Sequence, residues 1–234
     1  MLNVLKKGVD YPELVKPFQQ RVGSLMYACT STRCDIAFVV HNLCRCMQKP
    51  TPALMHETDI CLEYLRRTKS LGITYSSKKG TLRGFADASW ETRHSTSGWS
   101  ILWQDAVIAW GSRKQQCIAL SSCEAELVAL SEATKDMVYF RKLVRGLDSS
   151  SVDGPSDLAT DSQSARDISY NPESHERTKH IERRYFFVRD MVEKMEIRVP
   201  LVGTKDNYAD FFTKPLDPKR FAALRALLMN ERDA

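Results

Sequence analysis

The chain has 234 residues, of which 43% are hydrophobic and 27% are charged, the balance of a folded protein with one or two domains. It contains no run of about 18 uncharged apolar residues, and its first residues lack a long apolar stretch, so neither a membrane span nor a secretory signal is expected. The seven cysteines have no framework spacing, which favours free thiols in a reducing, intracellular compartment.

The net charge of +5 is distributed unevenly along the chain. Residues 1–80 hold twelve Lys and Arg against six Asp and Glu, whereas the remainder holds 22 against 23. A basic N-terminal part suits contact with a phosphate backbone. Helices with solvated lysines produce the same asymmetry equally often, so charge alone leaves both interpretations open.

The N-terminal part is predicted to be helical. Apolar residues recur at three and four positions over residues 13–68, and prolines interrupt the pattern before a last helix at about residues 53–67. The pattern changes near residue 78, which predicts two domains, residues 1–78 and residues 79–234.

The second part alternates strands and helices. LRGFADASW, TSGWSILWQ and AVIAWGSRK predict three strands, the last two joined by a tight hairpin at Gln104 and Asp105. A long, Ser-capped helix is expected over 121–147, followed by a strand at about 157–161 and helices to about residue 169 and at about 177–194. IRVPLVG predicts a last strand, NYADFFTK a helix start, and the remainder a C-terminal helix. This order implies an α/β fold in which a mixed five-stranded sheet carries flanking helices.

Four acidic residues occupy positions that charged side chains usually avoid. Asp87 lies inside an otherwise apolar strand, and Glu126 lies in the first turns of the long helix. Asp161 ends a short strand where a helix begins, and Asp210 lies in the first turn of the helix after the last strand. Strand ends and helix starts meet at one edge of an open α/β sheet, so these four carboxylates are expected to converge.

Clustered carboxylates repel one another unless cations neutralise them, and hard oxygen ligands select Mg²⁺ or Mn²⁺. Two such ions activate a water on one side of a phosphate and stabilise the leaving oxygen on the other. Taken singly, an acid near a helix start is more often a cap or a dipole partner. Asp87 fits that simpler interpretation least, because a buried acid inside a strand needs a partner.

Seven motifs in one order, FADASW, STSGW, WGSRKQ, LSSCEAELVALSEA, TDSQSA, RTKHI and ADFFTKPL, resemble the ribonuclease H domain of copia-type LTR retrotransposon Pol polyproteins. Upstream, RVGSLMYACTSTRCDIAFVV and LEYLRRTKSLGITY are similar to the end of the reverse transcriptase in that family, its thumb and connection. The resemblance covers almost the whole chain. It implies the C-terminal part of such a polyprotein, with residues 1–78 from the reverse transcriptase and residues 79–234 as a ribonuclease H-like domain.

The resemblance also implies an activity, which is hydrolysis of the RNA strand of an RNA:DNA hybrid at a four-carboxylate site that holds two Mg²⁺ ions, or Mn²⁺. Asp87, Asp161 and Asp210 match three of the catalytic metal ligands residue by residue. The fourth is one of the two glutamates in CEAEL. We select Glu126, because the apolar run of a helix core follows it, and Glu124 is the alternative.

Substrate contacts are expected beside this site. Ser162 and Gln163 are placed to donate hydrogen bonds to the RNA strand, although the same residue types after a strand are ordinary helix caps. Further contacts, to phosphates, are expected from four residues, Arg113, Lys114, Lys179 and His180. A solvated face explains the first two equally well, and His180 is a candidate proton carrier in product release or a structural histidine.

Two positions depart from the family pattern: Cys34 stands where the family has proline, and Glu57 where it has tryptophan. The paired aspartates of a polymerase are absent, so no DNA synthesis is expected, and the remaining reverse transcriptase is an expected partner besides the hybrid. The expected location is the cytoplasm, with virus-like particles and the nucleus as further compartments. The competing interpretation is a catalytically silent, nucleic-acid-binding relic of a retroelement.

Overall fold

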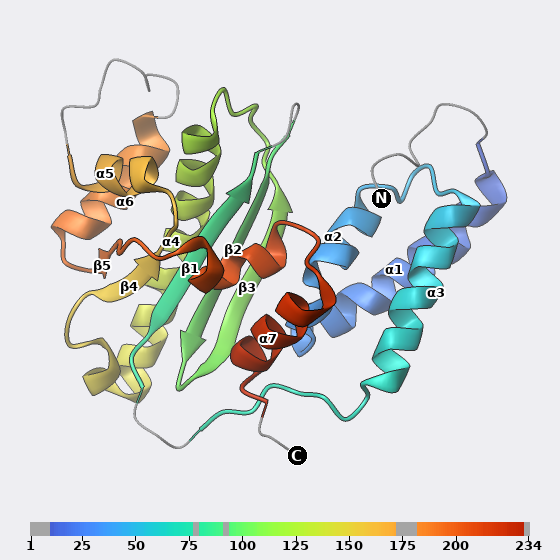
Figure 1. Ribbon diagram of the computed structural model, residues 1–234, viewed down its shortest axis with the longest axis horizontal. Helices are drawn as coiled ribbons and strands as arrows, with labels where there is room; N and C mark the ends of the chain where they lie inside the picture. Colours follow the sequence, from blue (N-terminus) through green and yellow to red (C-terminus); the bar gives the residue numbers. More distant parts are fainter. Residues whose placement is uncertain (1–9, 77–79, 91–93, 172–181, 232–234) are drawn as a thin grey trace. The chain divides into compact units, whose positions relative to one another are not determined.

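The computed structural model describes residues 10–76, 80–90, 94–171 and 182–231. Contacts divide the chain into two compact units, Met1–Gly72 and Ile73–Ala234 (Figure 1). The expected boundary near residue 78 lies outside the described residues. Thr74 ties the start of the second unit to its C-terminal helix, since its N–H donates to Met229 O at 2.9 Å and its carbonyl accepts from Asn230 Nδ2 at 2.7 Å.

The first unit is helical, as predicted. Its elements are α1 (Pro12–Ser31), the 3₁₀ turn η2 (Cys34–Ile36), α2 (Ala37–Cys44) and α3 (Pro52–Arg67). Arg33 pairs with buried Asp35 at 2.7 Å, and the Tyr64 hydroxyl donates to the same carboxylate at 2.6 Å. This buried network links η2 to α3, and the apolar stripe of α1 is fully buried at Phe18, Val22 and Leu25.

The second unit is built on one mixed five-stranded sheet, which confirms the predicted architecture. Its strands are β1 (Arg83–Ser89), β2 (Thr96–Trp103), β3 (Ala106–Lys114), β4 (Ser156–Ala159) and β5 (Ile197–Arg198), in the order β3-β2-β1-β4-β5. The first three strands are antiparallel, whereas β4 and β5 run parallel to β1. Strand β1 therefore lies at the centre of the sheet.

The connections follow from local chemistry. Gln104 and Asp105 have φ values of 53° and 65°, the left-handed conformations of the tight hairpin that was expected between β2 and β3. The last strand is shorter than predicted. Regular pairing ends at Arg198 and resumes as a single bridge at Leu201, because Pro200 between them has no N–H to donate.

Helices cover both faces of the sheet. They are α4 (Ser122–Leu147), α5 (Gln163–Tyr170), α6 (Glu182–Glu193) and α7 (Pro218–Met229), with 3₁₀ turns η3 (Ser149–Val152), η5 (Thr204–Asp206) and η6 (Tyr208–Phe212). The residues expected to start a helix, NYADFFTK, form the separate turn η6, and α7 begins only at Pro218. The part of the chain that the structure describes has no helix long and apolar enough to cross a membrane.

Two neighbouring residues of β2 show which element covers which face. The Trp99 indole N–H donates to Asp136 of α4 at 2.8 Å, so Trp99 points toward α4. A Cβ on Gly98 would lie 2.5 Å from Thr213 Cγ2 and 3.0 Å from Ala209 O, so Gly98 faces η6. Since successive strand residues point to opposite faces, α4 packs on one side of the sheet and η6 on the other (Figure 1).

Candidate metal centre

Asp87 lies on the η6 face of the central strand. It pairs across the ladder with Gly98, and only a residue without a side chain leaves room there for η6 to approach. Asp87 is 3% exposed, and its carboxylate accepts a hydrogen bond from the Thr213 hydroxyl. An acid in the middle of this strand is therefore buried with a specific partner.

Asp161 follows the end of β4, the parallel neighbour of β1. Its carboxylate accepts a hydrogen bond from Asn207 Nδ2 at 3.1 Å, and the same amide donates to Ala86 O of β1 at 3.1 Å. Asn207 also caps η6 through its Oδ1, which accepts from Ala209 N. One fully buried asparagine thus connects the elements that carry all three aspartates.

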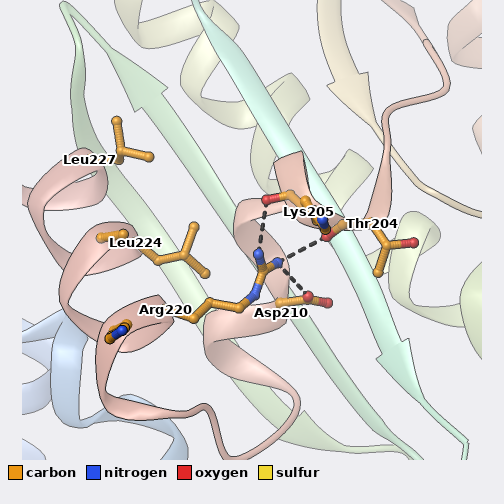
Figure 2. Close-up of a pocket in the computed structure, with 8 residues that line it drawn as sticks. Thr204, Lys205, Asp210, Arg220, Leu224 and Leu227 are labelled. Atoms are coloured by element: carbon orange, nitrogen blue, oxygen red, sulfur yellow. Dashed lines mark hydrogen bonds and ion pairs between the residues drawn. The ribbon is translucent and has the colours of Figure 1, made fainter.

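Asp210 lies within η6 and is 2% exposed. Lys214 Nζ lies 2.5 Å from its Oδ1, and Arg220 Nη2 lies 2.7 Å from its Oδ2. Figure 2 shows that the Arg220 guanidinium also donates to the backbone carbonyls of Thr204 and Lys205, each at 2.9 Å. Both oxygens of Asp210 are therefore held by cations of the chain itself.

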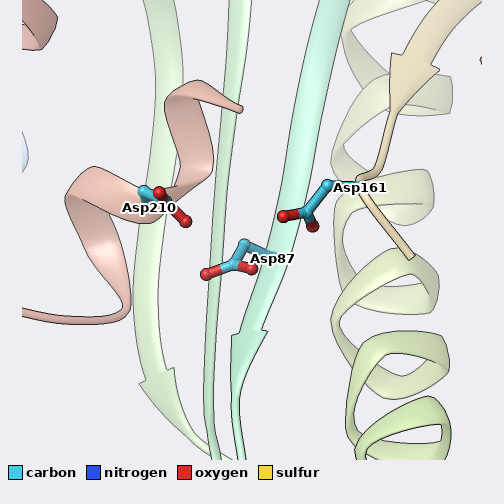
Figure 3. A group of neighbouring side chains, drawn as sticks. All are labelled: Asp87, Asp161 and Asp210. Carbon is cyan, nitrogen blue, oxygen red and sulfur yellow. The ribbon is translucent and has the colours of Figure 1, made fainter. Parts of the chain in front are cut away.

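The three aspartates converge (Figure 3). One carboxylate oxygen from each of Asp87, Asp161 and Asp210 lies within 4.8 Å of the others. Burial, together with the charges of Asp210 and Asp161, raises the pKa of Asp87 to about 6, although the Thr213 hydrogen bond and Lys214 oppose the shift. Buried anions this close together destabilise the ionised state unless a cation lies between them.

The two glutamates in the first turns of α4, Glu124 and Glu126, have different environments. The Glu124 carboxylate accepts a hydrogen bond from Leu120 N at 2.6 Å, and its own N–H donates to the Ser121 hydroxyl, so Glu124 is part of the helix cap. Glu126 instead interacts with Asp87 and Asp161. Burial first, and then these two charges, raise its pKa to about 9, against a hydrogen bond from the Ala88 backbone.

The side chains fit a divalent cation. Every donor is a carboxylate oxygen, the ligand type that Mg²⁺ and Mn²⁺ prefer. The Glu126 Oε2 atom is buried and has no hydrogen-bond partner, which leaves one oxygen beside the aspartates available to a ligand. The group of oxygens within 4.8 Å of one another contains the three aspartates and not Glu126, whose carboxylate interacts electrostatically with Asp87 and Asp161, whereas the Glu124 carboxylate is engaged by the helix cap.

Four of the six expected substrate-contacting residues are described, and Ser162 and Gln163 among them follow Asp161 and have ordinary local partners. The Ser162 hydroxyl caps α5 by accepting from Ala165 N, and Gln163 donates to Asp167 on the same helix. Arg113 and Lys114 are exposed at the end of β3 that pairs with Ser97 and Thr96, the same end of the sheet as Asp87. Arg113 also lies over the Trp99 ring, 5.4 Å from its centroid. Lys179 and His180 lie outside the described residues.

Four residues that contact the aspartates were not singled out from sequence. They are Asn207, Thr213, Lys214 and Arg220. A local signal existed for two of them, because Thr213 and Lys214 follow Asp210 by three and four residues and such positions share one side of a helical turn. Asn207 and Arg220 act across longer loops, which spacing does not reveal.

Comparison with known proteins places the chain among transposon polyproteins. It is 33% identical over 216 residues to the retrovirus-related Pol polyprotein of transposon TNT 1-94 from Nicotiana tabacum. That alignment covers 91% of the chain and 16% of the polyprotein. It is 33% identical over 218 residues to the corresponding polyprotein of transposon RE1 from Arabidopsis thaliana, covering 89% of the chain and 15% of that protein. A shorter relative, secreted RxLR effector protein 161 of Plasmopara viticola, is 36% identical over 53% of the chain and 90% of its own length. No family model matches the chain.

Among solved structures, the foamy viral protease-reverse transcriptase in complex with an RNA/DNA hybrid aligns with a TM-score of 0.51. The alignment covers 81% of this chain and 25% of that one at 13% identity. The LC11 ribonuclease H1, also in complex with an RNA/DNA hybrid, aligns over 57% of this chain and 94% of that one, with a TM-score of 0.44 and 12% identity.

The fold of the second unit is therefore ribonuclease H-like, with a carboxylate cluster at the end of its central strand that is able to hold a metal ion. The chain belongs to the retrovirus-related Pol polyproteins of copia-type transposons. It spans about a sixth of the length of the TNT 1-94 and RE1 polyproteins.

Proposed function

We propose that this chain is a ribonuclease H that hydrolyses the RNA strand of RNA:DNA hybrids by two-metal-ion catalysis. The observation that carries the proposal is the cluster itself, three aspartate oxygens within 4.8 Å of one another with an unpartnered oxygen of Glu126 beside them. Membership of the Pol polyproteins and the hybrid bound in the foamy viral structure support this substrate.

Asp87 is central among the four acids. It interacts electrostatically with Asp210 and Asp161, and Glu126 interacts with Asp87 and Asp161. Figure 3 shows the Asp87 carboxylate between those of Asp161 and Asp210. Asp87, Asp161, Asp210 and Glu126 would hold the divalent ions in the proposed site.

Bound Mg²⁺ or Mn²⁺ supplies Lewis-acid activation of the attacking water and stabilisation of the leaving oxygen. The chain contributes geometry. Asn207 orients Asp161 relative to β1, and Thr213 orients Asp87. These hydrogen bonds from Asn207 and Thr213 hold in place carboxylates that would otherwise repel one another. Hydrogen bonds to the ligands of a metal ion help to maintain its affinity.

The proposed substrate surface extends from the metal centre along the same end of the sheet. Lys114 is exposed there on the same face of the sheet as Asp87, whereas Arg113 lies over Trp99 on the α4 face, and both are proposed to contact phosphates of the hybrid. Ser162 and Gln163 follow Asp161 and face the RNA strand in this proposal, while their side chains also serve α5. The remaining reverse transcriptase of a polyprotein is the proposed partner that delivers the hybrid.

A cleavage assay on end-labelled hybrid tests the proposal. The purified chain is expected to cut the RNA strand with Mg²⁺ or Mn²⁺ and to stop in excess chelator. Asp161→Asn should abolish cleavage while hybrid binding remains. The matched control is Asp157→Asn, because Asp157 also lies at β4 but pairs with exposed Arg198.

Cleavage that persists in Asp161→Asn or in chelator would refute the metal mechanism. A wild-type protein that binds the hybrid and never cuts it with either metal would show that the chain is a silent relic.

A further inference from the structure

We propose that the two cationic side chains on Asp210 have opposite effects on divalent metal binding, Arg220 orienting the carboxylate for the metal and Lys214 competing with the metal for it. The inference rests on the proposed metal site. It concerns affinity for the ion rather than turnover, so it is tested without any nucleic acid.

Arg220 holds Oδ2 of Asp210, whereas Lys214 contacts Oδ1. Its Nη2 donates to Asp210 Oδ2 at 2.7 Å and to Thr204 O at 2.9 Å, and its Nη1 donates to Lys205 O at 2.9 Å (Figure 2). Because the guanidinium is planar and rigid, three bonds to a carboxylate and two backbone carbonyls determine one orientation. The Asp210 Oδ2 atom is therefore locked to η5.

The backbone of Arg220 is also fixed in position. Its backbone N–H donates to Asp217 Oδ1 at 3.1 Å in the cap of α7, and its side chain is 24% exposed. The start of α7 thus forms a rigid support for the Asp210 side chain. With Oδ2 restrained by Arg220, Oδ1 is the oxygen that remains for a metal ion.

Lys214 occupies that other oxygen. Its Nζ lies 2.5 Å from Asp210 Oδ1 and 3.9 Å from Asp87 Oδ2, so the ammonium lies between two of the three clustered aspartates. This is the position where a cation relieves their repulsion. An ammonium and a divalent ion cannot both lie against the same oxygen without strong repulsion, so Lys214 must withdraw when the metal binds.

Withdrawal is sterically open to Lys214. Its side chain is 40% exposed and carries its charge on a flexible four-carbon stem, whereas Arg220 is anchored at three points. The two residues therefore differ in mobility as well as in the oxygen that they hold.

The direction in which metal affinity changes distinguishes an orienting role of a cationic side chain from a purely electrostatic one. Electrostatics alone predicts that loss of either positive charge strengthens metal binding. Loss of an orienting partner of a metal ligand typically weakens affinity by about 10- to 100-fold. We therefore expect Lys214→Met to bind metal more tightly and Arg220→Met to bind it more weakly.

The experiment is calorimetric titration of Mn²⁺ into the metal-free full-length chain. Lys214→Met should tighten binding several-fold, and Arg220→Met should weaken it by about tenfold or more. Arg220→Lys keeps the charge but cannot make the same three bonds, so it should also weaken binding. Lys219→Met is the control and should leave the affinity unchanged, because Lys219 lines a pocket together with Asp210 and Arg220 but no described interaction joins it to Asp210.

Several results would overturn the inference. These are tighter binding in both Arg220 variants, unchanged or weaker binding in Lys214→Met, or a wild-type chain that binds no Mn²⁺. If Arg220→Met fails to fold, as judged by circular dichroism, Arg220→Lys decides the orienting role. A chain that shows the expected affinities but never cuts a hybrid would refute the proposed activity and leave this inference intact.

Discussion

The carboxylate of Asp87 should reduce the stability of the metal-free protein, so that Asp87→Asn stabilises the fold while it removes metal binding. Burial and neighbouring acids raise its pKa from 3.8 to about 6, a net shift that already includes the favourable contacts with Thr213 and Lys214. One pKa unit corresponds to about 1.4 kcal/mol, so the ionised Asp87 costs the folded state up to about 3 kcal/mol. Asparagine avoids this cost and still accepts the Thr213 hydrogen bond.

The pH dependence gives the prediction its sign. A raised pKa means that the folded state prefers the protonated acid, so the cost is absent below about pH 3.8, grows as the pH rises and is complete above about pH 6. Urea unfolding in chelator should therefore show Asp87→Asn to be more stable than wild type at pH 8, and equal to it below pH 4.

Two comparisons make this test decisive. Asp157→Asn, in an exposed ion pair with Arg198, should change stability by less than about 1 kcal/mol. Saturating Mn²⁺ should stabilise wild type and leave Asp87→Asn unaffected, because a ligand that binds only the native state adds to its stability. Equal or lower stability of metal-free Asp87→Asn at pH 8 would refute the reasoning.

Three further outcomes are expected. Glu126→Gln should abolish metal-dependent cleavage. Glu124→Gln should keep cleavage and lose about 1 kcal/mol of stability, because it weakens the cap of α4. The reverse pattern in a cleavage assay would exchange the roles assigned to the two glutamates. Because the pKa of Glu126 is about 9 without metal and the ligand must be ionised, metal affinity should rise with pH up to about 9. Calorimetry in buffers of different ionisation enthalpy should then detect proton release, and its absence at pH 7 would contradict the raised pKa. Gly98→Ala should lower stability by about 1–3 kcal/mol and weaken Mn²⁺ binding. The new Cβ would meet Thr213 Cγ2 at 2.5 Å and displace the turn that carries Asp210. Unfolding and titration curves that match those of the wild type would argue against this packing.

The strands and the long helix were predictable from sequence because their signals are local. Alternating apolar residues delimit β1 to β3 to within a residue or two, and the positive φ values at Gln104 and Asp105 agree with the tight turn expected there. Ser121 caps α4 as its sequence indicates. Each of these features depends on interactions between residues that are close along the chain.

The end of the chain was less predictable because its conformation depends on distant contacts. NYADFFTK has a helical composition, yet η6 stays short. Its N-cap Asn207 is held by hydrogen bonds to Ala86 of β1 and to Asp161, and Pro215 ends the turn before α7 begins. The last strand is likewise shortened around Pro200. The prolines themselves are visible in the sequence, whereas the contacts of Asn207 with Ala86 and Asp161 are not.

For the candidate site, residue types and motif order determined which acids to consider, and the fold brings one oxygen each of Asp87, Asp161 and Asp210 within 4.8 Å of one another. The sequence resemblance selected Glu126 over Glu124, and only the tertiary structure shows how their environments differ: the Glu124 carboxylate caps the helix, whereas Glu126 interacts with Asp87. Only the tertiary structure also revealed that Lys214 and Arg220 hold opposite oxygens of Asp210. Sequence patterns record chemistry and local spacing, whereas the direction in which a carboxylate points is decided by whichever distant groups pack around it.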